Sequence, residues 1–276
     1  MIKPLQIRAS TACGRIFSYG AQVTSWFPQG HQDALFVSPQ AVLRQGTAIR
    51  GGIPVVFPWF GAGRQAGMSP SHGLARTVDW HLTTVHADDQ TVLLEYEITQ
   101  EDATSPWFPH PFQARLTADL GQHLDLRMTV ANTGAEPFTY EQALHAYLAV
   151  GDVQQVVVQG LDGDIYVDKI DGDRLERQSG DLRLAGPIDR IYESRAEVRV
   201  VDPVLERSIR IAKEHSDQTV VWNPWQAGAE ALADLGPGNW RRMLCVEPAN
   251  VLDSAITLMP DESHQMAMRI SLDDFA

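Results

Sequence analysis

The chain has 276 residues, of which 44% are hydrophobic and 21% charged, as in ordinary globular proteins, so general disorder is excluded. Its 22 basic and 35 acidic residues give a formal net charge of −13, which makes nucleic acid a poor partner because it attracts clustered cations. No apolar run approaches the ~20 residues of a membrane span, and the N-terminus lacks the apolar core of a signal peptide. With only two cysteines, the sequence predicts a cytoplasmic, reduced protein without a membrane partner, and we expect a monomer.

The first expected element is a short helix that Ser38 caps and Pro39 starts, running towards Leu43. The next segment, residues 50–61, begins with Arg50 and two glycines, which let the backbone turn and approach a ligand closely. The remainder is apolar and rich in proline, so it cannot form a central strand and would make a rigid wall. A buried loop with a surface arginine is the alternative interpretation.

Residues 71–76 place an imidazole and a guanidinium four positions apart around a glycine. If this segment is extended, His72 and Arg76 point to the same face, because the side chains of a strand alternate with a period of two. Ser71 stands directly before them. By itself this spacing is a weak signal of a site.

Alternating apolar and polar residues over 92–99 and 124–131 predict two strands, each with one buried face. Another strand is expected around residues 141–147, where His145 lies among apolar residues. A histidine in such a place is more often a core residue with satisfied hydrogen bonds than a catalyst.

The second half of the chain continues the period of two. Two strands are expected within residues 198–211, on either side of a turn at 202–203, and a last one over 266–272. Residues 229–235 are good helix formers and are followed by a Gly-Pro pair that ends the helix. Short, closely spaced strands indicate a sandwich or barrel, so we predict an all-β fold with a few short helices in one domain, residues 1–276.

Glu247 stands between apolar neighbours and beside a proline. A carboxylate in such a run must be paired or functional, because burying an unpaired charge costs several kcal/mol. One interpretation is a structural ion pair with Arg241 or Arg242. Another is a pair with His145, which would be an acid/base couple.

The sequence carries no GxGxxG, no Walker loop and no GxSxG motif, so no cofactor is expected. His72, His145 and Glu247 could be interpreted as two histidines and a carboxylate that bind iron or zinc. Their wide separation and the absence of an HExxH spacing make this the weaker hypothesis, and we expect no metal.

Taken in order, these segments resemble the hexose-6-phosphate mutarotases, also called glucose-6-phosphate 1-epimerases, of the aldose 1-epimerase (galactose mutarotase-like) superfamily. The similarity extends from residues 20–26 to residues 247–249 and covers nearly the whole chain. Between these ends the matching segments are 50–54, 72–76, 107–112, 143–145, 166–169, 189–192 and 221–225. Any one segment is weak evidence, but together and in the family's order they are specific.

The resemblance implies a large antiparallel β-supersandwich that binds a sugar on its concave face. It implies that His145 is the general acid and Glu247 the general base. Arg50 and Arg76 resemble the family's substrate-binding arginines, and Asp189 its sugar-binding aspartate.

Three further residues are expected at the substrate. His72 belongs to the matching segment 72–76, and Trp222 could cover an apolar sugar face or belong to the core. The family often has glutamine where this chain has Ser71, and the shorter side chain cannot make the same hydrogen bond directly.

The expected reaction interconverts the α and β anomers of an aldohexose 6-phosphate such as glucose 6-phosphate. Glu247 would take the proton of the C1 hydroxyl while His145 protonates the ring oxygen. We expect burial to raise the pKa of Glu247, and a nearby carboxylate to keep His145 protonated. Three alternatives stay open: an aldose 1-epimerase of unphosphorylated sugar, a non-catalytic protein that binds a sugar phosphate, and a metal-dependent oxygenase or isomerase that uses His72, His145 and Glu247.

Overall fold

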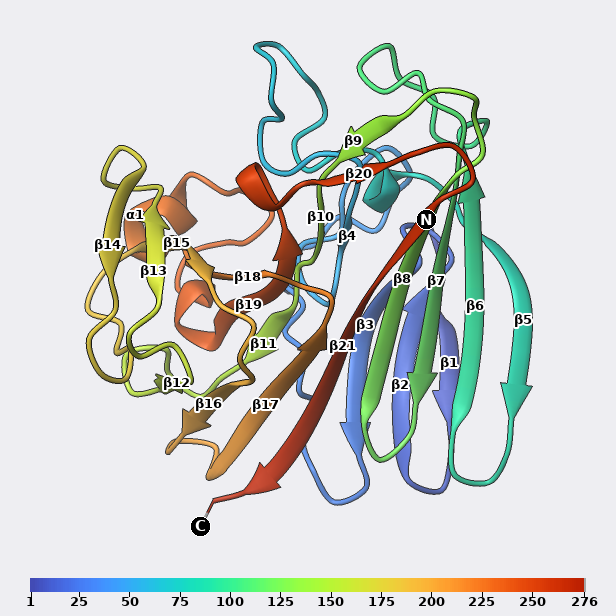
Figure 1. Ribbon diagram of the computed structural model, residues 1–276. Coiled ribbons are helices and arrows are strands. Elements are labelled where there is room, and N and C mark those ends of the chain that lie inside the picture. The colour runs from blue at the N-terminus through green and yellow to red at the C-terminus, as the bar shows by residue number, and fades with distance from the viewer. Residues whose placement is uncertain (276) are drawn as a thin grey trace.

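Two large antiparallel sheets dominate the computed structural model, which describes residues 1–275 (Figure 1). We name them sheet I and sheet II. Sheet I has the strand order β12 (Val157–Gln159), β16 (Val198–Asp202), β17 (Arg207–Glu214), β21 (Ser263–Asp274), β8 (Leu124–Asn132), β7 (Phe112–Leu120), β6 (Val92–Thr99) and β5 (His81–Ala87). Sheet II has the order β14 (Arg174–Arg177), β13 (Ile165–Asp168), β15 (Ile188–Glu193), β18 (Gln218–Asn223), β19 (Met243–Asn250), β10 (Gln142–Leu144) and β4 (Val55–Val56), and β11 (Tyr147–Ala149) also pairs with β19.

Within residues 1–275, two smaller sheets and four short helical segments complete the fold. The smaller sheets are formed by β1 (Leu5–Arg8), β2 (Ala12–Phe17) and β3 (Gln22–Pro28), and by β20 (Ile256–Leu258) with β9 (Phe138–Tyr140). The helical segments are α1 (Trp225–Glu230) and the 3₁₀ turns η1 (Ala75–Thr77), η2 (Asn239–Arg242) and η3 (Leu252–Ser254). The predicted all-β sandwich with a few short helices is therefore confirmed.

The period of two in the sequence corresponds to buried and exposed faces. Along β6, β7 and β8, every second side chain is buried, because one face of sheet I packs on the core and the other faces solvent. The strands expected over 92–99 and 124–131, around the 202–203 turn and over 266–272 are all present. In contrast, every residue of β19 is buried, as expected for a strand covered on both faces.

Both helix predictions need correction. No helix follows Ser38, because its hydroxyl accepts a hydrogen bond from the Gln40 N–H (3.0 Å) and donates to the Leu235 carbonyl (3.0 Å), which makes a turn that ties down another loop. The second helix lies earlier than residues 229–235. It starts at Trp225, where the side-chain oxygen of Asn223 accepts the Trp225 N–H (2.9 Å), and it ends at Glu230.

Candidate active site

His145 and Glu247 lie together because of strand register. Ala143 of β10 pairs with Ala249 of β19, and Tyr147 of β11 pairs with Cys245. The same register, continued across the break between β10 and β11, sets His145 opposite Glu247. The His145 N–H donates to the carbonyl of Pro54 (3.0 Å), which holds the break in place. His145 was expected on a strand, and the structure places it between two short ones.

The two side chains form a close, buried pair. His145 Nδ1 lies 3.0 Å from Glu247 Oε1, with 5% and 1% of the residues exposed. The contact is not aligned as a hydrogen bond, and within residues 1–275 neither His145 Nδ1 nor Glu247 Oε2 has a hydrogen-bond partner. Buried polar atoms are nearly always satisfied, so atoms left open in this way indicate a place for a ligand. Arg241 instead contacts Asp152.

The environment sets the protonation of this pair. Burial raises the pKa of Glu247 well above its ordinary value; the charge of Asp189 raises it further and Arg76 opposes. Burial lowers the pKa of His145 well below its ordinary value, and His72, Arg76 and Arg50 lower it further. The expectation that the carboxylate keeps His145 protonated is therefore wrong. The pair instead places its proton on Glu247 and leaves the imidazole neutral.

Tyr147 and Trp222 flank the imidazole of His145. The ring of Tyr147 stacks on it at 4.7 Å with an angle of 10°, and Trp222 meets it edge-on at 6.1 Å. Sequence analysis missed Tyr147 as a site residue. Its signal was present, because a residue two positions after His145 points to the same face of an extended segment.

Asp189 and Trp222 belong to one row of side chains across sheet II. Asp189 pairs with Trp222, Trp222 with Cys245, and Cys245 with Tyr147, so all four share a face. The Asp189 carboxylate makes no side-chain hydrogen bond or ion pair with the described part of the chain, and burial raises its pKa. Its carbonyl accepts from the Lys169 N–H (2.8 Å). Asp189 is thus an open acceptor on the face that carries Glu247.

His72 reaches the site from a turn rather than from an extended segment. Its backbone has a φ of 62°, and its ring lies 5.4 Å from the ring of His145 and 4.9 Å from that of Phe60. The Gly61 N–H donates to His72 Nδ1 (3.4 Å). Burial, with added effects of Arg76 and Arg50, lowers the pKa of His72 to about 3. His72 is therefore neutral and carries its proton on Nε2.

Two guanidinium groups lie beside the pair. Arg50 Nε donates to Asp234 (3.1 Å) and Nη1 to the hydroxyl of Tyr147 (3.0 Å). Burial opposes the charge of Arg50, but Tyr147 and Asp234 raise its pKa above the ordinary value. Arg76 Nη2 donates to the carbonyl of Ser71 (2.7 Å), while its buried Nε has no partner within residues 1–275. Ser71 contributes its backbone here, and its side chain is exposed.

The segment that carries Arg50 approaches β3 closely. Gly52 has a φ of 65°, and a Cβ on it would lie 2.3 Å from the carbonyl oxygen of Val23. The Gly52 carbonyl also accepts the N–H of Tyr147 (2.9 Å), which joins this segment to the strand beside His145. As expected, the proline-rich remainder forms no central strand: β4 is the only strand within residues 50–61, and it lies at the edge of sheet II.

The residues suggested for a metal are only partly brought together. Possible ligand atoms of His145, Cys245 and Glu247 lie within 4.8 Å of one another, and His72 is not in this group among residues 1–275. Burial raises the pKa of both Cys245 and Glu247, so an ion would have to displace two protons. The positive charge that lowers the pKa of His145 also repels a cation. The cluster fits acid/base chemistry better than metal binding.

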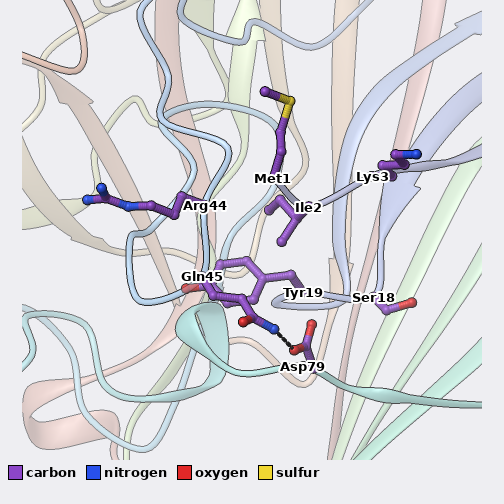
Figure 2. A pocket seen from close by; sticks show the side chains of 8 residues that line it. All are labelled: Met1, Ile2, Lys3, Ser18, Tyr19, Arg44, Gln45 and Asp79. Carbon is purple, nitrogen blue, oxygen red and sulfur yellow. Dashed lines mark hydrogen bonds between the residues drawn. The ribbon is translucent and has the colours of Figure 1, made fainter.

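A surface pocket elsewhere differs in kind from this site. Figure 2 shows its lining side chains, and its volume is about 420 Å³. The lining residues are Met1, Ile2, Lys3, Ser18, Tyr19, Arg44, Gln45 and Asp79. Its carboxylate, that of Asp79, accepts a hydrogen bond from Gln45 Nε2 (2.6 Å). The pocket contains none of the predicted site residues and no buried acid/base pair among its lining residues.

Solved structures identify the fold class. The chain superposes on a crystal structure from Salmonella typhimurium, described as that of a proposed mutarotase, with a TM-score of 0.92 and 28% identity over 99% of this chain and 91% of that one. A galactose mutarotase-like protein from Lactobacillus casei matches with a TM-score of 0.74 and 16% identity over 98% of this chain and 100% of that one, which shows the fold alone. The protein therefore has the galactose mutarotase-like sandwich.

Sequence comparison identifies the family. The model of the family described as aldose 1-epimerase matches residues 6–271, and the chain belongs to that family. A protein of Cenchrus ciliaris whose name proposes glucose-6-phosphate 1-epimerase activity is 34% identical over 95% of this chain and 82% of its own. A protein of Escherichia coli K12 with the same proposed activity is 33% identical over 88% and 80%. The protein is thus an epimerase, an enzyme of the isomerase class.

No helix within the described part of the chain is long and apolar enough to cross a membrane.

Proposed function

We propose that this enzyme interconverts the α and β anomers of an aldohexose 6-phosphate, with glucose 6-phosphate as the first candidate. The observation that carries the proposal is the His145–Glu247 pair, buried, 3.0 Å apart and with open polar atoms on both side chains. Opening a hemiacetal needs one group that accepts the C1 hydroxyl proton and one that protonates the ring oxygen. A buried acid/base pair beside polar groups that can bind a sugar supplies both of these groups.

The proposed ring opening consists of three proton transfers and the cleavage of the C1–O5 bond. Hydroxyl groups of a bound sugar donate to Glu247 and favour its charged form, so its proton passes to His145 across the 3.0 Å contact. Glu247 then accepts the C1 hydroxyl proton and His145 protonates the ring oxygen as the C1–O5 bond breaks. The aldehyde rotates about C1–C2 and closes with the roles reversed. No electrons are gained or lost, so the step needs no electron carrier.

The two arginines support a phosphorylated substrate. Asp234 and Tyr147 occupy Nε and Nη1 of Arg50, which orients the guanidinium and leaves Nη2 for a ligand. Arg76 has a buried Nε without a partner in residues 1–275. Guanidinium groups bind phosphate in bidentate fashion, and here they oppose a net charge of −13 that would repel the anion.

The ion pair between Arg50 and Asp234 also favours a second candidate. If both arginines are structural, the substrate is an unphosphorylated aldose. Magnetisation-exchange NMR separates the candidates, because it measures the exchange between anomers directly. We expect catalysed exchange of glucose 6-phosphate at substoichiometric enzyme and little of glucose or galactose. Faster exchange of the free sugars would support the second candidate, and tight binding of glucose 6-phosphate without exchange would contradict catalysis.

A further inference from the structure

Glu141 is a buried carboxylate that the proposed mechanism does not use. Its side chain is 4% exposed and accepts three hydrogen bonds. The donors are the N–H of Phe60 (2.9 Å), the N–H of Leu252 (2.8 Å) and Nε of Arg64 (3.1 Å). A carboxylate with three donors is well satisfied, so Glu141 has no open atom of its own for a substrate.

These hydrogen bonds join two segments that are far apart in sequence. Phe60 and Arg64 belong to the loop after β4, and Leu252 begins η3 after β19. The contact is reinforced because Arg64 Nη2 also donates to the carbonyl of Leu252, and the Glu141 N–H donates to the carbonyl of Pro58 (2.9 Å). Glu141 therefore holds the loop after β4 against the start of η3, just beyond the end of β19.

That loop in turn holds His72. Phe60, whose N–H Glu141 accepts, packs edge-on against the imidazole at 4.9 Å. The next amide, that of Gly61, donates to His72 Nδ1, and the Gly61 carbonyl accepts the backbone N–H of His72 (2.7 Å). A displaced Phe60-Gly61 backbone would release the imidazole from the ring of Phe60 and from the N–H of Gly61.

We propose that Glu141 is a positioning residue of the sugar site, which fixes the orientation and tautomer of His72 through the Phe60-Gly61 backbone. The inference rests on the proposed function, since it assumes that Nε2–H of His72 contacts the sugar. It assigns to Glu141 no proton transfer and no contact with the substrate.

The first test is Glu141→Gln. The amide retains one acceptor oxygen and turns an NH₂ group towards N–H donors, so the loop has to move. We expect KM for the hexose phosphate to rise about tenfold with a smaller change in kcat, because a contact to a sugar hydroxyl acts in both ground and transition states. Glu141→Asp keeps the charge and is expected to recover part of the loss.

Asp202→Asn is the matched control. Asp202 is also buried, at 0% exposure, and accepts three backbone N–H groups, those of Gly151, Val204 and Leu205 (2.8–3.1 Å). None of these residues contacts the site. The control is expected to lose stability, as Glu141→Gln does, but to keep KM and kcat within about twofold. If the Glu141 variants do not fold, Arg64→Ala, at a half-exposed side chain, should raise KM in the same direction.

A second readout does not depend on activity. Burial and the charges of Arg76 and Arg50 lower the pKa of His72 to about 3, with the rings of Phe60 and His145 against it. In Glu141→Gln the released imidazole is expected to titrate closer to its ordinary value of 6.5, as followed by NMR and assigned with His72→Asn. In the Asp202→Asn control the His72 signal should stay in place.

The outcomes separate the two proposals. If the wild type exchanges no sugar anomers, the proposed function fails, while the titration of His72 still tests the role of Glu141. If the wild type is active but Glu141→Gln and Arg64→Ala match the control in KM, and His72 does not change its titration, the positioning role is overturned.

Discussion

The carboxyl group of Glu247 is buried at a cost to the free energy of folding. Its pKa is raised in the folded protein, so above the ordinary value of 4.5 the folded state holds a proton that the unfolded state has lost. Burial of Glu247 therefore costs no stability below pH 4.5. As the pH rises from 4.5 through the raised pKa, the free energy of unfolding declines. The side chain that the proposed reaction needs makes the protein less stable at neutral pH.

Glu247→Gln should separate these two effects. The amide is nearly isosteric and carries no charge, so we expect anomer exchange to fall by at least about 100-fold while stability at neutral pH rises by roughly 1 kcal/mol or more. At a pH near 4 the variant and the wild type should unfold alike. Urea unfolding at several pH values and exchange NMR provide the measurements, and near-wild-type exchange would contradict the assignment of the base.

His145→Asn should lose exchange activity and still bind hexose phosphate in titration calorimetry. In the wild type, kcat/KM is expected to follow a bell-shaped pH profile. It falls at low pH as the pair takes up a second proton and at high pH as it loses the shared one. The apparent pKa values then belong to the pair. A flat profile between roughly pH 5 and pH 9 would count against a titrating pair.

Arg76→Ala tests the binding of the anion. Charge-assisted hydrogen bonds contribute roughly 1.5–3 kcal/mol, so the variant should lose about 10- to 100-fold in kcat/KM for the phosphorylated sugar, mostly through KM. Inorganic phosphate should compete less well in the variant, and Arg76→Lys should recover only part because an ammonium group lacks the planar fork. If the preference for phosphorylated over free sugar survives Arg76→Ala, Arg50 and Lys169 are the next candidates.

At the scale of elements, the strands were predictable and their pairing was not. Apolar and polar residues alternate along 92–99 and 124–131 because one face of the sheet is buried, and this leaves a local pattern in the sequence. The apposition of His145 and Glu247 depends on a register between segments about 100 residues apart, across a break that no local pattern marks. Both residues were found through the resemblance to a family. The strand register explains why their side chains lie together.

The role proposed for Glu141, positioning His72, was not predictable for a similar reason. Its partners Phe60, Arg64 and Leu252 come from two distant loops, and the sequence gives no spacing that links them. An extended segment would place His72 and Arg76 on one face. In the structure, His72 lies in a turn with a positive φ and Arg76 lies in η1. Loops that converge by tertiary packing leave little trace in the sequence.

Gly52→Ala is expected to damage the element that delivers Arg50. Alanine at a φ of 65° costs about 1–2 kcal/mol, and its Cβ would also meet backbone at 2.3 Å, so the segment has to shift. Gly30→Ala is the control, because Gly30 has a φ of 86° with nothing within 4 Å of a Cβ. Urea midpoints should fall further for Gly52→Ala, and KM should rise only there. Equal losses in both variants would contradict the close approach.

For the whole molecule, periodicity was enough to predict an all-β fold, and the family resemblance narrowed the choice between sandwich and barrel to a sandwich. The single-domain organisation, the cytoplasmic location and the monomeric state stay predictions. A net charge of −13 disfavours self-association through mutual repulsion, so light scattering should give the mass of one chain, 30.6 kDa. A mass of twice that value would contradict the monomer.

Because Cys245 is buried, the rate at which its thiol reacts can be used to measure local opening of the protein. This thiol is 0% exposed in the row with Trp222 and Tyr147, and burial raises its pKa, so a thiol reagent reaches it only when the packing around this row opens. Cys13, only partly buried on β2, reacts without such an event. The rate of the slow phase of labelling therefore measures how often the packing around the candidate active site opens, and a bound sugar phosphate should reduce this rate.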